Sequence, residues 1–335
     1  MATIVKRGNK YRVQIRRKGF VTGSRSFHQK SDALEWARFM EVKADRGELP
    51  TPVRVLNQYK VRDILERYRD IITAQKLSAV TEAYMIDAFL REPIANLTLS
   101  QITPAHFATY RDKRLKEVKA GTVNRELGII KHAFDIAERE WDIPIKLNPL
   151  SKLKKLRANN SRSRRLSAEE YNAIEDAFEY SRNPYILLLV RFALATGMRR
   201  GEILNLTWDA INSNTRTLYI PVTKNGHPRT IPLSGDAISI LAEIKQVEYT
   251  DKDKRKECYV FPLSDNAAKL AWQRLATKAG LHDLHFHDLR HEAVSRFFER
   301  GLSVPEVALI SGHRDYRMLF RYTHLKAEDV AAKLN

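Results

Sequence analysis

Apolar residues recur at steps of three and four over residues 61–140, which is the spacing that places them on one face of an α-helix. Thr103 and Pro104 form an N-cap and first-turn pair, and Gly121 interrupts the pattern. The pattern predicts a compact unit of four helices. The expected helical segments are a first around Ile64, Tyr68, Ile71 and Ile72, then Val80 to Leu90, Thr103 to Val118, and Thr122 to Trp141.

Two basic runs without a single acid flank this helical unit. Residues 1–30 hold nine Lys and Arg, and Ser151 to Arg165 holds seven, in a chain of 335 residues with a net charge of +18. A surface that only keeps a protein in solution usually mixes both signs. Because 43% of the residues are apolar, the chain is a folded basic protein and not a disordered polycation. We therefore expect an anionic partner, most simply nucleic acid.

The first basic run has the period of a β-strand. From Tyr11 to Arg17 apolar residues alternate with Arg12, Gln14 and Arg16, so one face of the strand is basic. A second strand is expected from Phe20 to Phe27. Such a basic ribbon can enter the major groove of DNA, and these three polar residues are the candidate contacts.

A helix is expected to back this small sheet. Ser31 is a candidate N-cap and Gly47 a candidate end of the helix. The apolar stripe of this helix would comprise Leu34, Ala37, Met40 and Ala44, widened by Trp36 and Phe39.

Two segments have the composition of linkers. Residues 49–56 contain two prolines, and the second basic run precedes a capping box, Ser167-Ala-Glu-Glu170, that opens a new helical segment. The sequence thus predicts a multidomain, mostly α-helical fold. The expected parts are 1–48, a small β-sheet plus a helix; 57–150, four helices; 151–165, a basic linker; and 166–335, a mainly helical domain with a small β-sheet. The candidate DNA contacts of the linker are Lys152, Lys154, Lys155, Arg162, Arg164 and Arg165.

Composition also excludes several classes of protein. The one cysteine, Cys258, can form neither an intramolecular disulfide nor a Cys-rich zinc site, as is usual in a reducing compartment. The longest apolar run, Ile186 to Val190, is far shorter than the roughly 18 residues of a membrane span. Residues 1–10 contain no apolar signal region. We expect a cytoplasmic, nucleoid-associated protein without a membrane partner.

Chemistry-bearing residues gather in three segments of the second half of the chain. His287 and Arg290 are three residues apart and would share one helix face. Guanidinium, imidazole and phenol groups without clustered carboxylates suit a phosphodiester better than Mg²⁺ or Ca²⁺. A tyrosine can act as a nucleophile, and a lysine or histidine can protonate the leaving oxygen. The three segments are Ala195 to Trp208, Thr223 to Leu233, and His285 to His324.

The order of these residues resembles that of the tyrosine recombinase (phage integrase) family. The basic ribbon and the four-helix unit resemble the family's arm-binding and core-binding domains, so that the resemblance covers almost the whole chain. The segment from His285 to Phe298 is most similar to shufflon-type invertases and related phage integrases. The matching residues are Arg199, Lys224, His287-x-x-Arg290, His313 and Tyr322, within the boxes Thr196 to Glu202, His287 to His291, and Arg321 to His324.

The resemblance implies a site-specific recombinase that integrates, excises or inverts DNA without metal, cofactor or ATP. Tyr322 would attack a phosphate and leave a 3′-phosphotyrosyl bond. Arg199 and Arg290 would clamp that phosphate. Lys224, in a turn between strands Thr217 to Val222 and Arg229 to Leu233, would protonate the departing 5′-oxygen.

The resemblance implies supporting roles for the remaining site residues. His287 would assist proton transfer, His313 would bind the phosphate, and Glu202 would hold Arg199 in place. The family commonly has leucine where this chain has Ser311. Because that position neighbours the ligand without contacting it in the family, no loss of activity is expected from the serine.

The resemblance also implies partners. They are double-stranded DNA at core sites and at accessory arm sites, other copies of the chain in a tetramer on DNA, and an excisionase or a DNA-bending protein. The tail from Thr323 to Asn335 would pack on its own protomer or, as we favour, on a neighbouring one.

Several alternatives stay open from the residues alone. His227 and Arg229 compete with Lys224, and Tyr316 competes with Tyr322. A type IB topoisomerase-like enzyme has similar chemistry, but the N-terminal ribbon argues against it. A DNA-binding regulator with a decayed site is disfavoured because no catalytic position is missing. Three further histidines are interpreted as structural: His282, His285 and His291.

Overall fold

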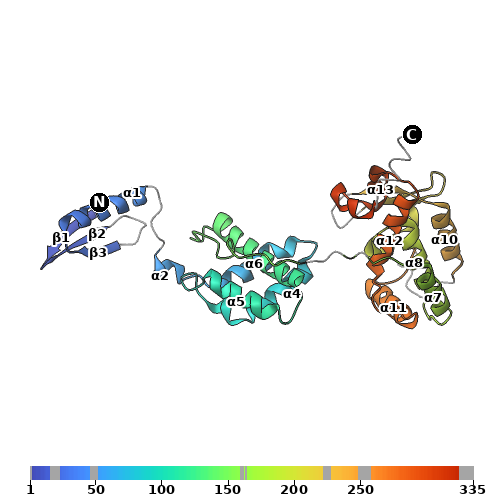
Figure 1. Ribbon diagram of the computed structural model, residues 1–335, viewed down its shortest axis with the longest axis horizontal. Coiled ribbons are helices and arrows are strands. Elements are labelled where there is room, and N and C mark those ends of the chain that lie inside the picture. Colours follow the sequence, from blue (N-terminus) through green and yellow to red (C-terminus); the bar gives the residue numbers. More distant parts are fainter. Residues whose placement is uncertain are drawn as a thin grey trace. The chain divides into compact units, whose positions relative to one another are not determined.

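The chain forms two compact units, Met1–Asn160 and Ser161–Asn335, whose helices and strands are drawn in Figure 1. Each unit has hydrophobic clusters of its own. Among the residues that the structure describes, no helix combines the length and the apolar character needed to cross a membrane. This computed structural model describes residues 2–15, 23–45, 52–158, 162, 164–221, 228–247 and 258–323.

The N-terminal segment forms an antiparallel sheet of order β1-β2-β3 (Figure 1). Its register pairs Arg12 with Val5 on one side and with Ser26 on the other. Successive residues of a strand point to opposite faces, so Arg12 and Gln14 share the face opposite to the fully buried Val13. The expected alternation is confirmed for these residues, and Arg16 lies outside the described part. The elements are β1 (Ala2–Arg7), β2 (Lys10–Ile15), β3 (Gly23–Phe27) and α1 (Lys30–Asp45).

Three details of this segment differ from expectation. Strand β1 was not expected. Helix α1 begins one residue before Ser31, which therefore lies in the first turn and is not the N-cap. The expected apolar stripe was wrong at Leu34 and Phe39, which are exposed, whereas Ala33 and Ala37 are buried. Small side chains on the buried face let the helix approach the sheet closely. Gly47 lies outside the described residues.

The next segment confirms the expected four-helix unit. Its core is aromatic: Phe107 packs edge-on against Phe134 at 5.9 Å between ring centroids, and Tyr68 is fully buried. Two expectations were wrong in detail, because Ile71 is exposed and the expected linker 49–56 contains a short helix. The helices are α2 (Val53–Leu56), α3 (Val61–Ile71), α4 (Ala79–Leu90), α5 (Pro104–Arg114) and α6 (Ala120–Glu140).

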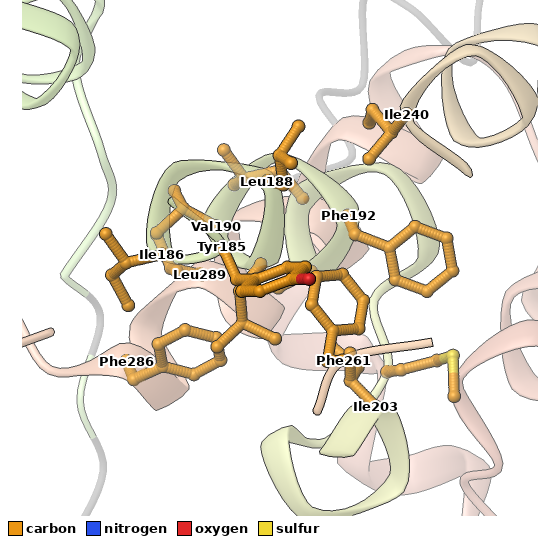
Figure 2. Close-up of a cluster of buried hydrophobic side chains, with 14 of the residues drawn as sticks. Tyr185, Ile186, Leu188, Val190, Phe192, Ile203, Ile240, Phe261, Phe286 and Leu289 are labelled. Carbon is orange, nitrogen blue, oxygen red and sulfur yellow. The ribbon is translucent and has the colours of Figure 1, made fainter. Parts of the chain in front are cut away.

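The second unit is built around one buried helix. Side chains leave α8 on all sides, and Figure 2 shows Ile186, Leu188, Val190 and Phe192 pointing in different directions from it. A helix that is apolar on most sides belongs in a core, which explains the longest apolar run of the sequence. The one charged residue of α8, Arg191, pairs with Glu243. The helices are α7 (Ala168–Phe178), α8 (Ile186–Thr196), α9 (Arg200–Leu204), α10 (Gly235–Gln246), α11 (Asp265–Lys278), α12 (Phe286–Glu299) and α13 (Val304–Ser311).

A small antiparallel sheet and short 3₁₀ turns, of which η3 (Trp208–Ala210) precedes the sheet, complete the second unit. The sheet has the order β4-β5-β6 and pairs Ile220 with Arg229. Both expected strands are confirmed in shorter form, and the turn between them, with Lys224, lies outside the described residues. The elements are β4 (Ile211–Asn212), β5 (Thr217–Ile220), β6 (Arg229–Pro232), η5 (Tyr316–Met318) and η6 (Phe320–Tyr322).

Candidate active site

A glycine turn at the end of α8 sets the position of Arg199. Gly197 adopts a left-handed conformation with φ of 62°, and a Cβ there would lie 3.1 Å from Phe297 Cε2. Only glycine takes this conformation at little cost. The chain then reverses, and Arg199 becomes the N-cap of α9.

Glu202 holds two arginines. Its carboxylate accepts from Arg199 Nη1 at 2.8 Å and from Arg229 Nη1 and Nη2 at 3.0 and 2.8 Å. Burial alone would raise the pKa of Glu202, but the hydrogen bonds and charges of Arg229 and Arg199 lower that pKa to about 2. The expected contact with Arg199 is therefore present. Arg229, which the sequence offered only as an alternative to Lys224, is a second partner.

Arg290 joins two segments that are far apart in the sequence. From α12 it donates to the carbonyl oxygens of Gly197 at 2.7 Å and Ser311 at 2.6 Å. It is 4% exposed, and burial followed by the nearby charge of Arg199 lowers its pKa to about 9. Arg290 thus stays charged at neutral pH. Because both acceptors are neutral carbonyls, the positive charge has no directly bound carboxylate in the described part of the chain, and the charge of Glu202 opposes the lowering of the pKa only in part.

The residue before the Gly-His pair contacts the histidine. Ser311 Oγ donates its one hydrogen to Val307 O at 2.6 Å, so at 2.7 Å it accepts from His313 Nδ1. The expectation that the serine causes no loss of activity remains a prediction, and the structure adds a contact between Ser311 and the imidazole of His313. Burial, followed by the charges of Arg290 and Arg199, lowers the pKa of His313 to about 4. His313 is therefore neutral near pH 7, with the lone pair on Nε2.

Gly312 is a second position that requires glycine. Its φ is 73°, and a Cβ there would lie 3.0 Å from Arg229 Cζ. The same glycine therefore ends α13 and leaves room for the guanidinium that binds Glu202.

Tyr322 lies against a histidine from α12. It is 7% exposed, and its Oη forms a hydrogen bond with His291 Nδ1. The two rings stack at 5.6 Å between centroids, and the ring of His287 meets that of His291 edge-on at 4.9 Å. Burial raises the pKa of Tyr322, and the charges of Arg321 and Arg290 partly oppose this shift. From the sequence we interpreted His291 as structural. Its position one helical turn after His287 indicates a neighbour on α12, but no local signal points to Tyr322.

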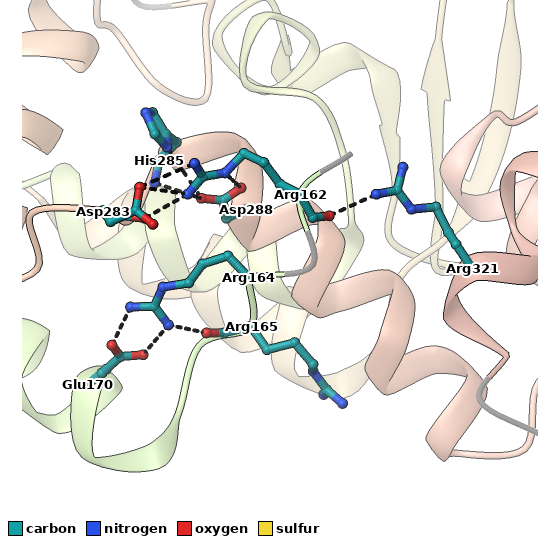
Figure 3. A network of polar contacts seen from close by, with 8 residues as sticks. All are labelled: Arg162, Arg164, Arg165, Glu170, Asp283, His285, Asp288 and Arg321. Carbon is teal, nitrogen blue, oxygen red and sulfur yellow. Dashed lines mark hydrogen bonds and ion pairs between the residues drawn. The ribbon is translucent and has the colours of Figure 1, made fainter. Parts of the chain in front are cut away.

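The arginines at the end of the basic linker have carboxylate partners (Figure 3). Arg162 donates to both oxygens of Asp288 at 3.1 Å, and its carbonyl accepts from Arg321 at 2.7 Å. Their expected role in DNA binding remains a prediction. The structure also shows that Arg162 and Arg165 hold this end of the linker against α12 and that Arg164 holds it against α7. The other pairs are Arg164 with Glu170, and Arg165 with Glu292 and Glu299. Lys152, Lys154 and Lys155 are exposed.

The structure brings most of the expected site together. Four nearby groups act on the pKa of Arg290, so they lie close to its guanidinium. They are Arg199, Glu202, Arg229 and Tyr322. Two of the three guanidinium groups, those of Arg199 and Arg229, pair with the carboxylate of Glu202, and that of Arg290 does not, which leaves an excess of positive charge beside a phenol. Such a site can bind a phosphodiester and stabilise the charge of its transition state. In the described part of the chain, no group of three or more His, Cys, Asp or Glu residues could hold a metal ion.

Two family profiles match the sequence. The profile of the phage integrase family matches residues 164–329, and that of the phage integrase N-terminal domain matches residues 58–157. The chain therefore belongs to the phage integrase family, whose members are tyrosine recombinases. It is a site-specific recombinase, and a topoisomerase-like function is not favoured.

Individual relatives agree with this assignment. A shufflon-specific DNA recombinase of Escherichia coli is 37% identical over 280 residues, covering 81% of this chain and 70% of the relative. A putative integrase/recombinase of Haemophilus influenzae is 35% identical over 330 residues, covering 95% of this chain and 86% of the relative. A crystal structure of a lambda integrase dimer bound to a core site matches with a TM-score of 0.65 and 23% identity, covering 96% of this chain and 94% of that one. This match confirms the mostly helical, multidomain fold.

Proposed function

We propose that this recombinase cuts and rejoins double-stranded DNA through a 3′-phosphotyrosyl bond at Tyr322, without metal or ATP. The observation that carries the proposal is the buried charge of Arg290 beside Arg199 and Tyr322. Among the described residues its hydrogen-bond acceptors are two neutral carbonyl oxygens. A phosphate between these guanidinium groups would supply the missing negative charge.

The residues would then divide the reaction as follows. Arg199 and Arg290 bind the non-bridging oxygens of the scissile phosphate, and Glu202 orients Arg199. Tyr322 Oη attacks phosphorus, the bond to the 5′-oxygen breaks, and Lys224 protonates that oxygen, with His287 assisting proton transfer. The reverse sequence, with a different 5′-hydroxyl as nucleophile, completes strand exchange.

His313 would change its protonation state when DNA binds. In the free site it is neutral, with Nδ1–H on Ser311 and no hydrogen on Nε2. A bound phosphate brings negative charge, which raises the pKa of a nearby imidazole. The protonated ring then donates from Nε2 to the phosphate while Nδ1–H keeps its bond to Ser311.

We assign the parts of the chain to parts of the DNA. Residues 1–48 would bind accessory arm sites through the face that carries Arg12, Gln14 and Arg16. Residues 57–150 and 166–335 would clamp a core site, with the lysines of the linker 151–165 along the backbone.

The chain would act as a tetramer, with an excisionase or a DNA-bending protein as a further partner in the nucleoid. A lambda integrase tetramer bound to a Holliday junction supports this assembly, since its fold is similar, with a TM-score of 0.64. The tail expected to reach a neighbouring copy lies outside the described residues, apart from Thr323.

Duplex fragments from the DNA that adjoins the gene would test this function. The protein is incubated with the fragments, the reactions are denatured, and covalent protein–DNA adducts are identified. The fragments found in adducts are then incubated in pairs with fresh protein. Joining of two different duplexes is expected from a recombinase. Relaxation of supercoiled DNA without joining would support a topoisomerase instead, and binding without an adduct would support a regulator. Tyr322→Phe should bind DNA and form no adduct, whereas the control Tyr316→Phe, at an exposed tyrosine, should react normally.

A further inference from the structure

One side chain in contact with the reacting oxygen has no role in the function proposed above. His291 Nδ1 forms a hydrogen bond with Tyr322 Oη, and the near-parallel stacking of the two rings, 25° apart, fixes their mutual orientation. The histidine comes from α12, the helix that also carries Arg290, and the tyrosine comes from η6. The contact therefore joins two elements and is not a consequence of helical neighbours alone.

We propose that His291 is the general base that accepts the phenol proton of Tyr322 during strand cleavage. This role rests on the proposed function, because it requires Tyr322 to be the nucleophile. As Oη attacks phosphorus, the Oη–H bond breaks and its proton moves to His291 Nδ1, while the bond from phosphorus to the 5′-oxygen breaks. On rejoining, the imidazolium returns the proton to Oη as the phosphotyrosyl bond breaks.

The surroundings of His291 keep it in the neutral form that a base requires. The charged and titratable groups that face it are His287, Asp288 and Arg290 from α12, and Arg321 and Tyr322 from η6. Burial, followed by His287 and Arg321, lowers the pKa of His291 to about 4. A ring that is neutral at pH 7 has a free lone pair on one nitrogen, and Nδ1 is the nitrogen that meets the phenol.

The geometry distinguishes His291 from His287. His287 lies at the first turn of α12 and is exposed, whereas His291 is half-buried beside the phenol. His287 meets His291 edge-on, so it is placed to relay or stabilise charge on the ring that contacts Oη. His291 would thus accept the proton from the nucleophile, and His287 would stabilise or relay the charge on His291.

A competing interpretation is that the contact restrains Tyr322 before DNA binds. Removal of His291 would then speed up cleavage or leave its rate unchanged. A general base contributes about 10²-fold to 10⁴-fold to a rate, so its loss produces the opposite effect. The sign of the change therefore separates the two interpretations.

The experiment measures adduct formation by the full-length chain on a nicked duplex that carries the trapped core site, in single turnovers from about pH 6 to 9. The test variant is His291→Asn, since asparagine can accept a hydrogen bond from Oη but cannot take its proton. The matched control is His282→Asn, at an exposed histidine before the same helix. We expect the wild-type rate to be nearly independent of pH. The rate of His291→Asn should be at least about 10²-fold lower at pH 7 and should rise about tenfold per pH unit, because only the ionised phenol now reacts.

A second measurement distinguishes the loss of a base from misfolding of the variant. Replacing Tyr322 by 3,5-difluorotyrosine makes the phenol more acidic, and it should restore most of the lost rate in His291→Asn. A structural defect would not be repaired in this way. The role of His291 is overturned if His291→Asn cleaves at the wild-type rate with the wild-type pH profile. It is also overturned if the more acidic phenol does not restore the rate of His291→Asn. Failure of the wild-type chain to form any adduct would instead overturn the proposed function.

Discussion

Removal of the charge of Glu202 should destabilise the second unit by about 3 kcal/mol. The substitution Glu202→Gln keeps the size of the side chain but leaves Arg199 and the buried Arg229 without their carboxylate. The pKa of Glu202 is lowered from 4.5 to about 2, and each unit corresponds to about 1.36 kcal/mol, which gives about 3 kcal/mol. Loss of one partner of a buried ion pair typically costs about 3–5 kcal/mol, in agreement with this figure.

Urea unfolding of the full-length chain, followed by tryptophan fluorescence at several pH values, measures this loss. Because the pKa of Glu202 is lower in the folded state, its stabilisation is fully present above about pH 4.5 and disappears as the pH falls towards 2. The difference between wild type and Glu202→Gln should therefore shrink at acid pH. The control is Glu179→Gln, at an exposed glutamate, which should unfold like the wild type. A difference below about 1 kcal/mol at pH 7, or one that does not depend on pH, would refute the assignment of Glu202 as the shared partner of both arginines.

Three further substitutions or deletions test other parts of the account. Gly312→Ala should lower the free energy of unfolding by about 1–2 kcal/mol in the same urea experiment, because its φ is 73°; unchanged stability would contradict the geometry. Ser311→Ala removes the acceptor of His313 Nδ1–H, so adduct formation should slow about fivefold, equivalent to about 1 kcal/mol; an unchanged rate would show that this bond does not position the ring. Deletion of residues 1–48 should weaken binding to accessory sites in gel-shift assays and spare core-site cleavage. Loss of core-site cleavage would contradict the domain assignment.

The parts of the fold that could be predicted from the sequence are those with long periodic segments. Steps of three and four residues around Tyr68 identify the four-helix unit because one face of each helix must be buried. The capping box at Ser167 likewise marks the start of α7 correctly, with Ser167 Oγ accepting from Glu170 N at 3.2 Å. The predicted apolar stripe of α1 was wrong at Leu34 and Phe39. Periodicity predicts that the segment is helical, but it does not predict which of two adjacent faces of the helix packs against a small sheet.

The candidate site was predicted as a set of residues with one contact among them, that between Glu202 and Arg199. The order and spacing of its residues resemble those of a known family, and that resemblance predicts the chemistry. Two partners were not identified, Arg229 and His291, since each depends on a contact between elements that are far apart in the sequence. Local patterns carry no information about such contacts.

The identity of the residue that becomes linked to DNA tests the central claim most directly. The adduct formed on the trapped core site is digested with trypsin and nuclease, and mass spectrometry locates the nucleotide on the peptide, while a polynucleotide kinase tests the released strand for a free 5′-hydroxyl. We expect a nucleotide joined through its 3′-phosphate to Tyr322, and a 5′-end that the kinase can label. A nucleotide on Tyr316 or any other residue, or a strand with a 5′-phosphate, would contradict it.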